Sequence, residues 1–105
     1  MSYKLRFVQR FQASHEKEFM ELERAFAQLE RKYADFPKGR RFRTYAGREA
    51  TNTLIWECDF PTLEAAQRAL QFFAQDSRHE KLFRKQAPYF LDAYTEIYEE
   101  ILKCT

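Results

Sequence analysis

Two histidines and an asparagine are the residues of this sequence best suited to move a proton. The chain has two histidines, His15 and His79, a residue type with a reference pKa near neutrality, and Asn52 offers both an amide donor and an acceptor. We take His15 and Asn52 as the candidate catalytic residues, although a histidine at the start of a helix is more often simply solvated. Neither histidine belongs to an HExxH pair, and Cys58 and Cys104 lack the paired spacing of a zinc site. We therefore expect no metal and no other cofactor.

A second group of side chains could bind a small apolar or anionic molecule. It comprises one arginine, one tryptophan and three tyrosines, namely Arg43, Tyr45, Trp56, Tyr94 and Tyr98. Each has a structural explanation too, because a strand tryptophan more often packs against helices and arginines near acidic strands more often form salt bridges. The tyrosines fit a cavity or an interface equally well. No nucleophile elbow, phosphate loop or catalytic triad spacing is present, so the sequence does not predict an ordinary hydrolase or kinase.

The composition indicates one soluble globular domain over residues 1–105. With 105 residues, 45% of them hydrophobic and 17% aromatic, the chain can bury one core but not two. Its net charge of +2 comes from 18 basic and 16 acidic residues that are interleaved, so nucleic acid is not an expected partner. Basic residues interrupt the N-terminal apolar stretch, and no run of about 18 apolar residues could span a bilayer. We expect a cytoplasmic protein with no membrane partner.

A strand and a helix should position the first of these residues. Residues 3–12 alternate apolar and basic side chains, which is typical of a half-buried strand. Ser14 can cap a helix that ends near Asp35, before Pro37. The apolar stripe of this helix recurs at steps of three and four, through Phe19, Leu22, Phe26, Leu29, Tyr33 and Phe36.

The rest of the chain predicts a hairpin, a broken helix and a final strand. Residues 40–47 and 51–60 are rich in β-branched and aromatic residues, which suits two strands joined across 47–50. Thr62 can cap the next helix, and a break is expected near Asp76, where "SRHE" has the spacing of a capping box, with Ser77 and Glu80 as its ends. The tail suits a helical stripe or a strand, and we predict a strand over 93–101.

Together these elements predict a single-domain α+β fold of the ferredoxin-like type. The order β-α-β-β-α-β gives an antiparallel sheet, with strand order 4-1-3-2 and helices on one face. The helix side would take the apolar strand residues Leu5, Phe7, Phe42, Leu54, Trp56, Cys58, Phe60, Ile97 and Ile101. The other side would carry charges that alternate in sign from strand to strand: Glu96 and Glu100, then Lys4, Arg6 and Arg10, then Glu57 and Asp59, then Arg41 and Arg43. Because those charges and the tyrosines suit a second copy, we expect a homodimer.

The strand before the turn can face either way. A four-residue loop at 47–50 pairs Arg43 with Leu54 and Arg41 with Trp56, which turns both arginines toward the helices. A three- or five-residue loop, or a β-bulge, keeps the arginines on the other side. The sequence alone leaves both arrangements open.

In these segments the chain resembles the dimeric α+β barrel superfamily, and within it the NIPSNAP-like branch. The resemblance is carried by "RTYAG" in the second strand, "NTLIWECDFPTLEAAQRAL" from the third strand into its helix, "DSRHEKLF" at the next helix and "EIYEEI" in the last strand. It implies two subunits that join their sheets into a barrel, with a cavity that some relatives use for a small molecule. The implied function is a small-molecule-binding or assembly domain.

The same resemblance implies an alternative function. Relatives include cofactor-free monooxygenases of antibiotic biosynthesis, which use an asparagine, a tryptophan and a histidine in their pocket. Asn52, Trp56 and His15 supply those residue types here. The alternative is therefore a cofactor-independent monooxygenase acting on an aromatic substrate, in which a histidine or an asparagine assists proton removal.

Overall fold

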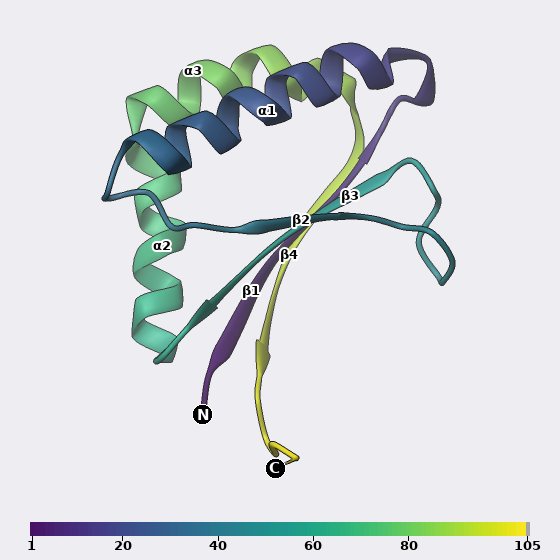
Figure 1. The fold of residues 1–105 in the computed structure, drawn as a ribbon. Coiled ribbons are helices and arrows are strands. Elements are labelled where there is room, and N and C mark those ends of the chain that lie inside the picture. The colour runs from purple at the N-terminus through teal and green to yellow at the C-terminus, as the bar shows by residue number, and fades with distance from the viewer. Residues whose placement is uncertain (105) are drawn as a thin grey trace.

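The computed structural model describes residues 1–104 and contains four strands, three α-helices and two short 3-10 turns (Figure 1). In chain order these elements are β1 (Tyr3–Phe11), η1 (Ala13–His15), α1 (Glu16–Lys32), β2 (Arg40–Arg43), β3 (Thr53–Phe60), α2 (Leu63–Gln75), α3 (Ser77–Gln86), η2 (Ala87–Tyr89) and β4 (Phe90–Glu99). The strands form one antiparallel sheet in the order β2-β3-β1-β4, and the helices cover one of its faces. The predicted ferredoxin-like architecture and strand order are confirmed.

The helix side of the sheet forms the main hydrophobic core. Leu5 of β1 lies opposite Cys58 of β3 and Ile97 of β4, and Phe7 lies opposite Trp56. These side chains pack with one face of α2 in a cluster that contains Leu5, Phe7, Trp56, Cys58, Phe60, Ala69, Leu70, Phe73 and Ile97. Fully burying one Leu or Phe side chain stabilises a fold by roughly 1.5–3 kcal/mol, so this cluster is a principal source of stability.

The opposite face, here called the outer face, carries charges that alternate in sign across the sheet. One row runs from β2 to β4 through Arg40, Glu57, Arg6 and Glu96. Arg6 Nε lies 2.9 Å from Glu57, and Arg6 NH1 lies 3.3 Å from Glu96. The predicted alternation is therefore confirmed where Glu96, Arg6 and Glu57 lie side by side, while the predicted contribution of Glu100 is wrong because it lies beyond β4. β2 contributes Arg40 instead of the arginines expected there.

Of the two facings of β2 that the sequence leaves open, the structure has the one that turns the arginines toward the helices, which corrects the placement of Phe42 on the helix side. Arg41 lies opposite Trp56 and Arg43 opposite Leu54, so both arginines point to the helix side and Phe42 points to the outer face. This register is the one that a turn centred on residues 47–50 predicts. Both arginines form ion pairs with carboxylates on α1. These pairs compensate for the cost of placing charged side chains on the covered side of the sheet.

The ends of α1 differ from the predicted ends. The helix begins after η1 with His15 as its N-cap residue, and Ser14 lies inside η1 instead of capping α1. It ends at Lys32, because Tyr33 has extended backbone with φ −114° and ψ 125°. The segment up to Asp35 therefore belongs to the connection that leads into β2.

The second helical region has one cap as predicted and one that differs. Thr62 caps α2, since its hydroxyl accepts the backbone N–H of Ala65 at 3.1 Å. The predicted break near Asp76 is confirmed, but Asp76 itself caps α3 in place of Ser77: its carboxylate accepts two backbone N–H bonds from the first turn, at 2.9 and 3.0 Å. Within residues 1–104, no helix combines the length and the apolar composition needed to cross a membrane.

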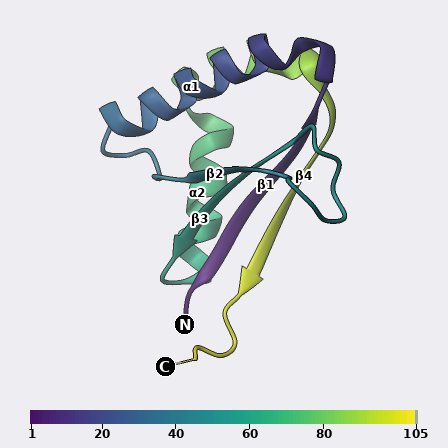
Figure 2. The same ribbon diagram turned by 45° about the vertical axis from the view of Figure 1, so that its right-hand side comes forward.

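The final strand is confirmed, although β4 spans Phe90–Glu99 and so begins three residues before the predicted start. It runs beside β1, and both ends of the chain lie at the same edge of the molecule (Figure 2). Hydrogen bonds between Ser2 and Glu100 join the start of β1 to the end of β4. Ser2 Oγ donates to the Glu100 carboxylate at 3.1 Å, and the Glu100 N–H donates to Ser2 O at 2.8 Å. Ile101 lies beyond the strand and is 79% exposed, so its predicted place on the helix side is wrong.

Candidate functional site

A cavity of about 470 Å³ lies between the helices and the sheet. It exists because α2 packs directly on β1 and β3, whereas α1 and α3 pack on each other above the sheet (Figure 1). Phe83 of α3 and the residues 93–95 of the edge strand β4 belong to its lining. Since Phe83 is 43% exposed, the mouth lies between α3 and β4.

One wall of the cavity is aromatic. Phe7 and Trp56 stack with ring centres 5.0 Å apart, and Phe73 meets each of them edge-on at 5.5 Å. Phe26 and Phe36 also line the space, from α1 and the connection that follows it. Fixed rings of this kind present a flat apolar surface, which favours a flat apolar ligand.

The polar end of the cavity lies next to Trp56, the cross-strand neighbour of Arg41, and consists of Arg41, Glu23 and Glu30, here called the Arg41 cluster. Arg41 Nε lies 2.6 Å from Glu23, and its terminal nitrogens donate to both oxygens of Glu30, at 3.2 and 2.5 Å. Glu23 is 5% exposed and Glu30 is 7% exposed. Gln86 completes the network, because its Nε2 donates to Glu23 at 3.0 Å. Two carboxylates share one guanidinium, so the cluster carries one net negative charge.

His79 lies in the same cavity, on the first turn of α3. Its ring sits 5.0 Å from Phe73 and 5.1 Å from Phe26, centre to centre. Burial among these rings lowers the pKa of His79 below its usual value, against the opposing effect of Asp76 and Glu30. The imidazole is therefore neutral at pH 7 and can accept a proton from a molecule in the cavity.

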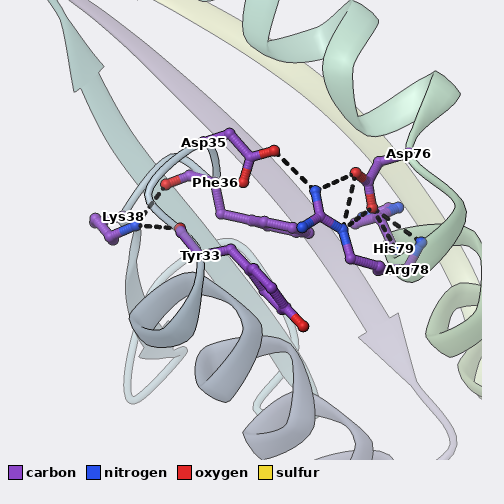
Figure 3. Close-up of polar contacts among 7 residues, drawn as sticks. All are labelled: Tyr33, Asp35, Phe36, Lys38, Asp76, Arg78 and His79. Atoms are coloured by element: carbon purple, nitrogen blue, oxygen red, sulfur yellow. Dashed lines mark hydrogen bonds and ion pairs between the residues drawn. The ribbon is translucent and has the colours of Figure 1, made fainter.

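A salt-bridged arginine holds one end of the cavity together (Figure 3). Arg78 NH2 lies 2.8 Å from Asp35 and 2.6 Å from Asp76, and its guanidinium lies over the rings of Tyr33 at 4.4 Å and Phe36 at 4.8 Å. We call these five residues the Arg78 clasp. It fixes the segment after α1 to the start of α3, and thereby holds two parts of the cavity lining, the Phe36 ring and the turn that carries His79.

The predicted ligand-binding residues lie on two sides of the sheet. Trp56 lines the helix-side cavity and is also part of the core. Four others line a separate hollow of about 880 Å³ between the outer face and the hairpin loop: Arg43, Tyr45, Tyr94 and Tyr98. Tyr94 contributes to both spaces. The structure thus brings the three tyrosines together, and of these Tyr94 alone also shares a cavity lining with Trp56.

The residues of the outer hollow are largely engaged by other side chains. Arg43 donates to both oxygens of Glu16, at 2.9 and 2.5 Å. Tyr94 donates to Glu49, and this hydrogen bond raises the pKa of Tyr94 to about 12. Tyr98 accepts from Arg6 at 3.2 Å, whereas Tyr45 is 94% exposed on the loop. Three of the four predicted residues in the hollow are therefore already hydrogen-bonded to other side chains.

The two candidate catalytic residues do not face the cavity. His15 is exposed at the start of α1, 3.6 Å from Glu18 and beside the Tyr89 ring. Asn52 donates from Nδ2 to the backbone oxygen of Phe11 at 2.6 Å, which is a structural bond between the hairpin and β1. The histidine in the cavity is His79, and the side-chain amide that β1 brings to the lining is that of Gln9.

Sequence reasoning missed the polar end of the cavity. The buried residues of α1 are Phe19, Glu23, Phe26 and Glu30, with steps of four, three and four. The two glutamates therefore occupy core-facing positions of a helical stripe. That spacing is visible in the sequence, but it indicates a site only once Arg41 is known to face the helices. Among residues 1–104, no group of three or more His, Cys, Asp and Glu side chains is arranged to hold a metal ion.

Comparison with known proteins agrees with the architecture. No protein-family model matches the chain, and no curated protein matches it. Among solved structures, an uncharacterized NIPSNAP domain protein from Burkholderia xenovorans has a TM-score of 0.77 and 14% identity, covering 100% of this chain and 99% of that one. A NIPSNAP family protein from Agrobacterium tumefaciens has a TM-score of 0.75 and 13% identity, covering 96% of this chain and 94% of that one. The chain has the NIPSNAP-like fold.

The NIPSNAP-like fold extends to proteins with a named activity. A solved antibiotic biosynthesis monooxygenase has a TM-score of 0.72 with this chain at 10% identity, and the match covers 95% of this chain and 99% of that one. The resemblance inferred from the sequence is thus confirmed at the level of the fold. Both groups of proteins that the resemblance implied occur among the structural neighbours.

Proposed function

We propose that this NIPSNAP-like chain is a homodimeric small-molecule-binding protein whose ligand occupies the helix-side cavity. The observation that carries the proposal is the cavity itself, about 470 Å³ in volume, with an aromatic wall and a polar end. An apolar ligand is favoured over an anionic one, because Arg41 and Arg43 are both engaged by carboxylates. The cytoplasm is the compartment that we propose for it, from the sequence features given above.

Native mass spectrometry of freshly purified protein tests the ligand proposal without presupposing a ligand. Ala93 lines the cavity from β4, so Ala93→Phe should fill the mouth and abolish retention of a small molecule. Ala46 lies on the hairpin loop, so Ala46→Phe is the matched control and should retain it. Equal retention by the two variants would place the ligand elsewhere and contradict the proposal.

The homodimer is supported by the chemistry of the outer face. Three aromatic side chains are substantially exposed there, with Phe42 at 40%, Tyr94 at 39% and Tyr98 at 46%. The charged row of Arg40, Glu57, Arg6 and Glu96 alternates in sign, which permits a second copy to pair with it. Light scattering coupled to size exclusion should give twice the chain mass. A stable monomer at micromolar concentration would contradict the dimer.

A second candidate function is a cofactor-independent monooxygenase. It is favoured by one observation, that Trp56 and a neutral histidine, His79, line the same cavity. In this reaction His79 would accept a proton from an aromatic substrate, and the resulting anion would reduce dioxygen. With anthrone as the probe, one methylene carbon would become the carbonyl of anthraquinone, and the second oxygen atom would leave as water.

The monooxygenase is tested by following anthraquinone formation and oxygen uptake together. His79→Gln should lose the activity, whereas His15→Gln, which changes an exposed histidine, should keep it. An absence of turnover by the unaltered protein, or equal turnover by the two variants, would exclude His79 as the base for this probe.

A further inference from the structure

The charge balance of the cavity is negative at its polar end. Among the described residues that line it, the acidic ones are Glu23, Glu30 and Glu80, and Arg41 carries the one fixed positive charge. Glu80 is paired with Arg84 outside the cavity, at 2.8 Å. Arg41 is shared between Glu23 and Glu30, so one carboxylate charge remains without a compensating cation.

The groups at this end of the cavity that can still form hydrogen bonds are acceptors. All three guanidinium nitrogens of Arg41 donate hydrogen bonds to carboxylate oxygens. The Nε2 of Gln86 donates to Glu23 and to a backbone oxygen. Gln9 also lines the cavity, and its buried Oε1 atom has no hydrogen-bond donor among residues 1–104. Carboxylates can accept about four hydrogen bonds each, so Glu23 and Glu30 retain free lone pairs.

The aromatic wall lies beside these acceptors, because Trp56 is the cross-strand neighbour of Arg41. Phe7, Trp56 and Phe73 present fixed rings, and the faces of aromatic rings attract cations. A ligand with an apolar body and a cationic head would satisfy both ends. A carboxylate ligand would bring a third negative charge beside Glu23 and Glu30, which is electrostatically unfavourable.

We infer that the ligand of this cavity is a hydrophobic amine, bound as its ammonium ion against the Arg41 cluster and Gln9, with its apolar part on the Trp56 wall. The inference rests on the proposed ligand-binding function and specifies the class of ligand. It also makes Glu23 and Glu30 specificity-determining residues, because they supply the negative charge that distinguishes an amine from an acid.

The test uses three probes that share one ring system and differ in charge: 1-naphthylmethylamine, 1-naphthalenemethanol and 1-naphthoic acid. Trp56 is the single tryptophan, so its indole N–H gives one isolated cross-peak in a ¹H–¹⁵N spectrum that reports on the cavity. The amine should shift this peak with an affinity at least about tenfold above that of the acid, a difference of about 1.4 kcal/mol. The alcohol should lie between them.

Glu23→Gln removes the excess charge, and it should bring the amine and the acid to within about threefold of each other, since less than about 0.7 kcal/mol would then separate them. Glu21→Gln, an exposed glutamate on the same helix, should leave the preference unchanged. If Glu23→Gln does not fold, the ratio measured on the unaltered protein decides by itself. Equal or tighter binding of the acid overturns the amine inference but keeps the binding cavity. No response to any probe overturns both.

Discussion

Arg41 and Arg43 lie two residues apart on the same side of β2, yet their surroundings differ greatly. The side chain of Arg41 is 19% exposed and pairs with two carboxylates that are themselves nearly buried, whereas the side chain of Arg43 is 51% exposed and pairs with one exposed carboxylate. Removing one partner of a buried ion pair leaves an uncompensated charge, while an exposed pair contributes little. The two arginines therefore provide a matched comparison.

We predict that Arg41→Ala lowers the free energy of unfolding by about 3 kcal/mol, because it leaves the buried carboxylates of Glu23 and Glu30 without a positively charged partner. Arg43→Ala should cost less than about 1 kcal/mol. Urea denaturation of both variants at neutral pH measures the difference. Similar values for the two would mean that the Arg41 cluster is hydrated in solution.

His79 should make stability depend on pH. Because burial lowers its pKa in the folded protein, the unfolded chain takes up this proton first as the pH falls through about 6.5. The free energy of unfolding should therefore decrease between about pH 7 and about pH 5, and His79→Gln should reduce that decrease. His15→Gln changes an exposed histidine and should leave the slope as it is. Thermal unfolding across this pH range measures the slopes, and identical slopes for all three proteins would contradict the assignment.

The candidate site was only partly predictable at the level of single residues. Trp56 was identified as a candidate because large aromatic side chains either pack or bind, and in this structure it does line the cavity. His79 was considered but His15 was chosen instead, because both histidines lie at helix starts and the sequence does not show which one faces the cavity. Gln9 was not identified, since it lies on an otherwise apolar strand side. Glu23 and Glu30 look solvated in the sequence, and the arginine that neutralises one of them lies 18 and 11 residues away.

Among the elements, the connection from α1 to β2 brings the backbone against the indole of Trp56. A Cβ atom on Gly39 would lie 1.9 Å from Trp56 Nε1, so only glycine fits there without displacement of the ring. The Gly39 N–H also donates to Glu30 at 3.0 Å, which ties this connection to the Arg41 cluster. The close approach thus links the position of β2 to the shape of the cavity.

We predict that Gly39→Ala lowers the free energy of unfolding by about 1–3 kcal/mol and shifts the fluorescence of Trp56, because the added methyl group pushes the indole away. Gly47→Ala is the control. Its methyl group would meet no atom within 4 Å, although the φ of +152° makes the substitution cost about 1–2 kcal/mol. Only Gly39→Ala should change the emission spectrum, and an unchanged spectrum in that variant would contradict the close contact.

Strand order and helix placement followed from the sequence because alternation, caps and breaks are local signals. The strand order 4-1-3-2 is confirmed, and so are the Thr62 cap and the break near Asp76. The facing of β2 could not be derived in the same way, because hydrophobic patterning treats its arginines as outward-facing residues. Their compensating carboxylates lie on α1, and only the assembled structure brings the two elements together.

In the whole molecule, the two faces of the sheet differ in what covers them. The helices cover one face, and the other keeps exposed aromatic side chains between rows of alternating charge. If the outer faces of two copies pair as we propose, unfolding must also separate the subunits. The temperature of half-unfolding should then rise with concentration, over about 1 to 100 µM, because mass action favours the associated state. A midpoint that does not change over this range would contradict a dimer coupled to folding.

The hydrogen bonds between Ser2 and Glu100 make the chain suitable for circular permutation. They hold the beginning of β1 against the end of β4, while the loop at 44–52 is the longest connection between two consecutive elements and exposes Tyr45 to solvent. A circularly permuted chain, with a short linker from Glu100 to Ser2 and new termini inside that loop, would begin with β3 and finish with β2. Because no core contact is cut, we expect this permutant to keep the circular dichroism spectrum of the parent and to give the same Trp56 indole N–H resonance.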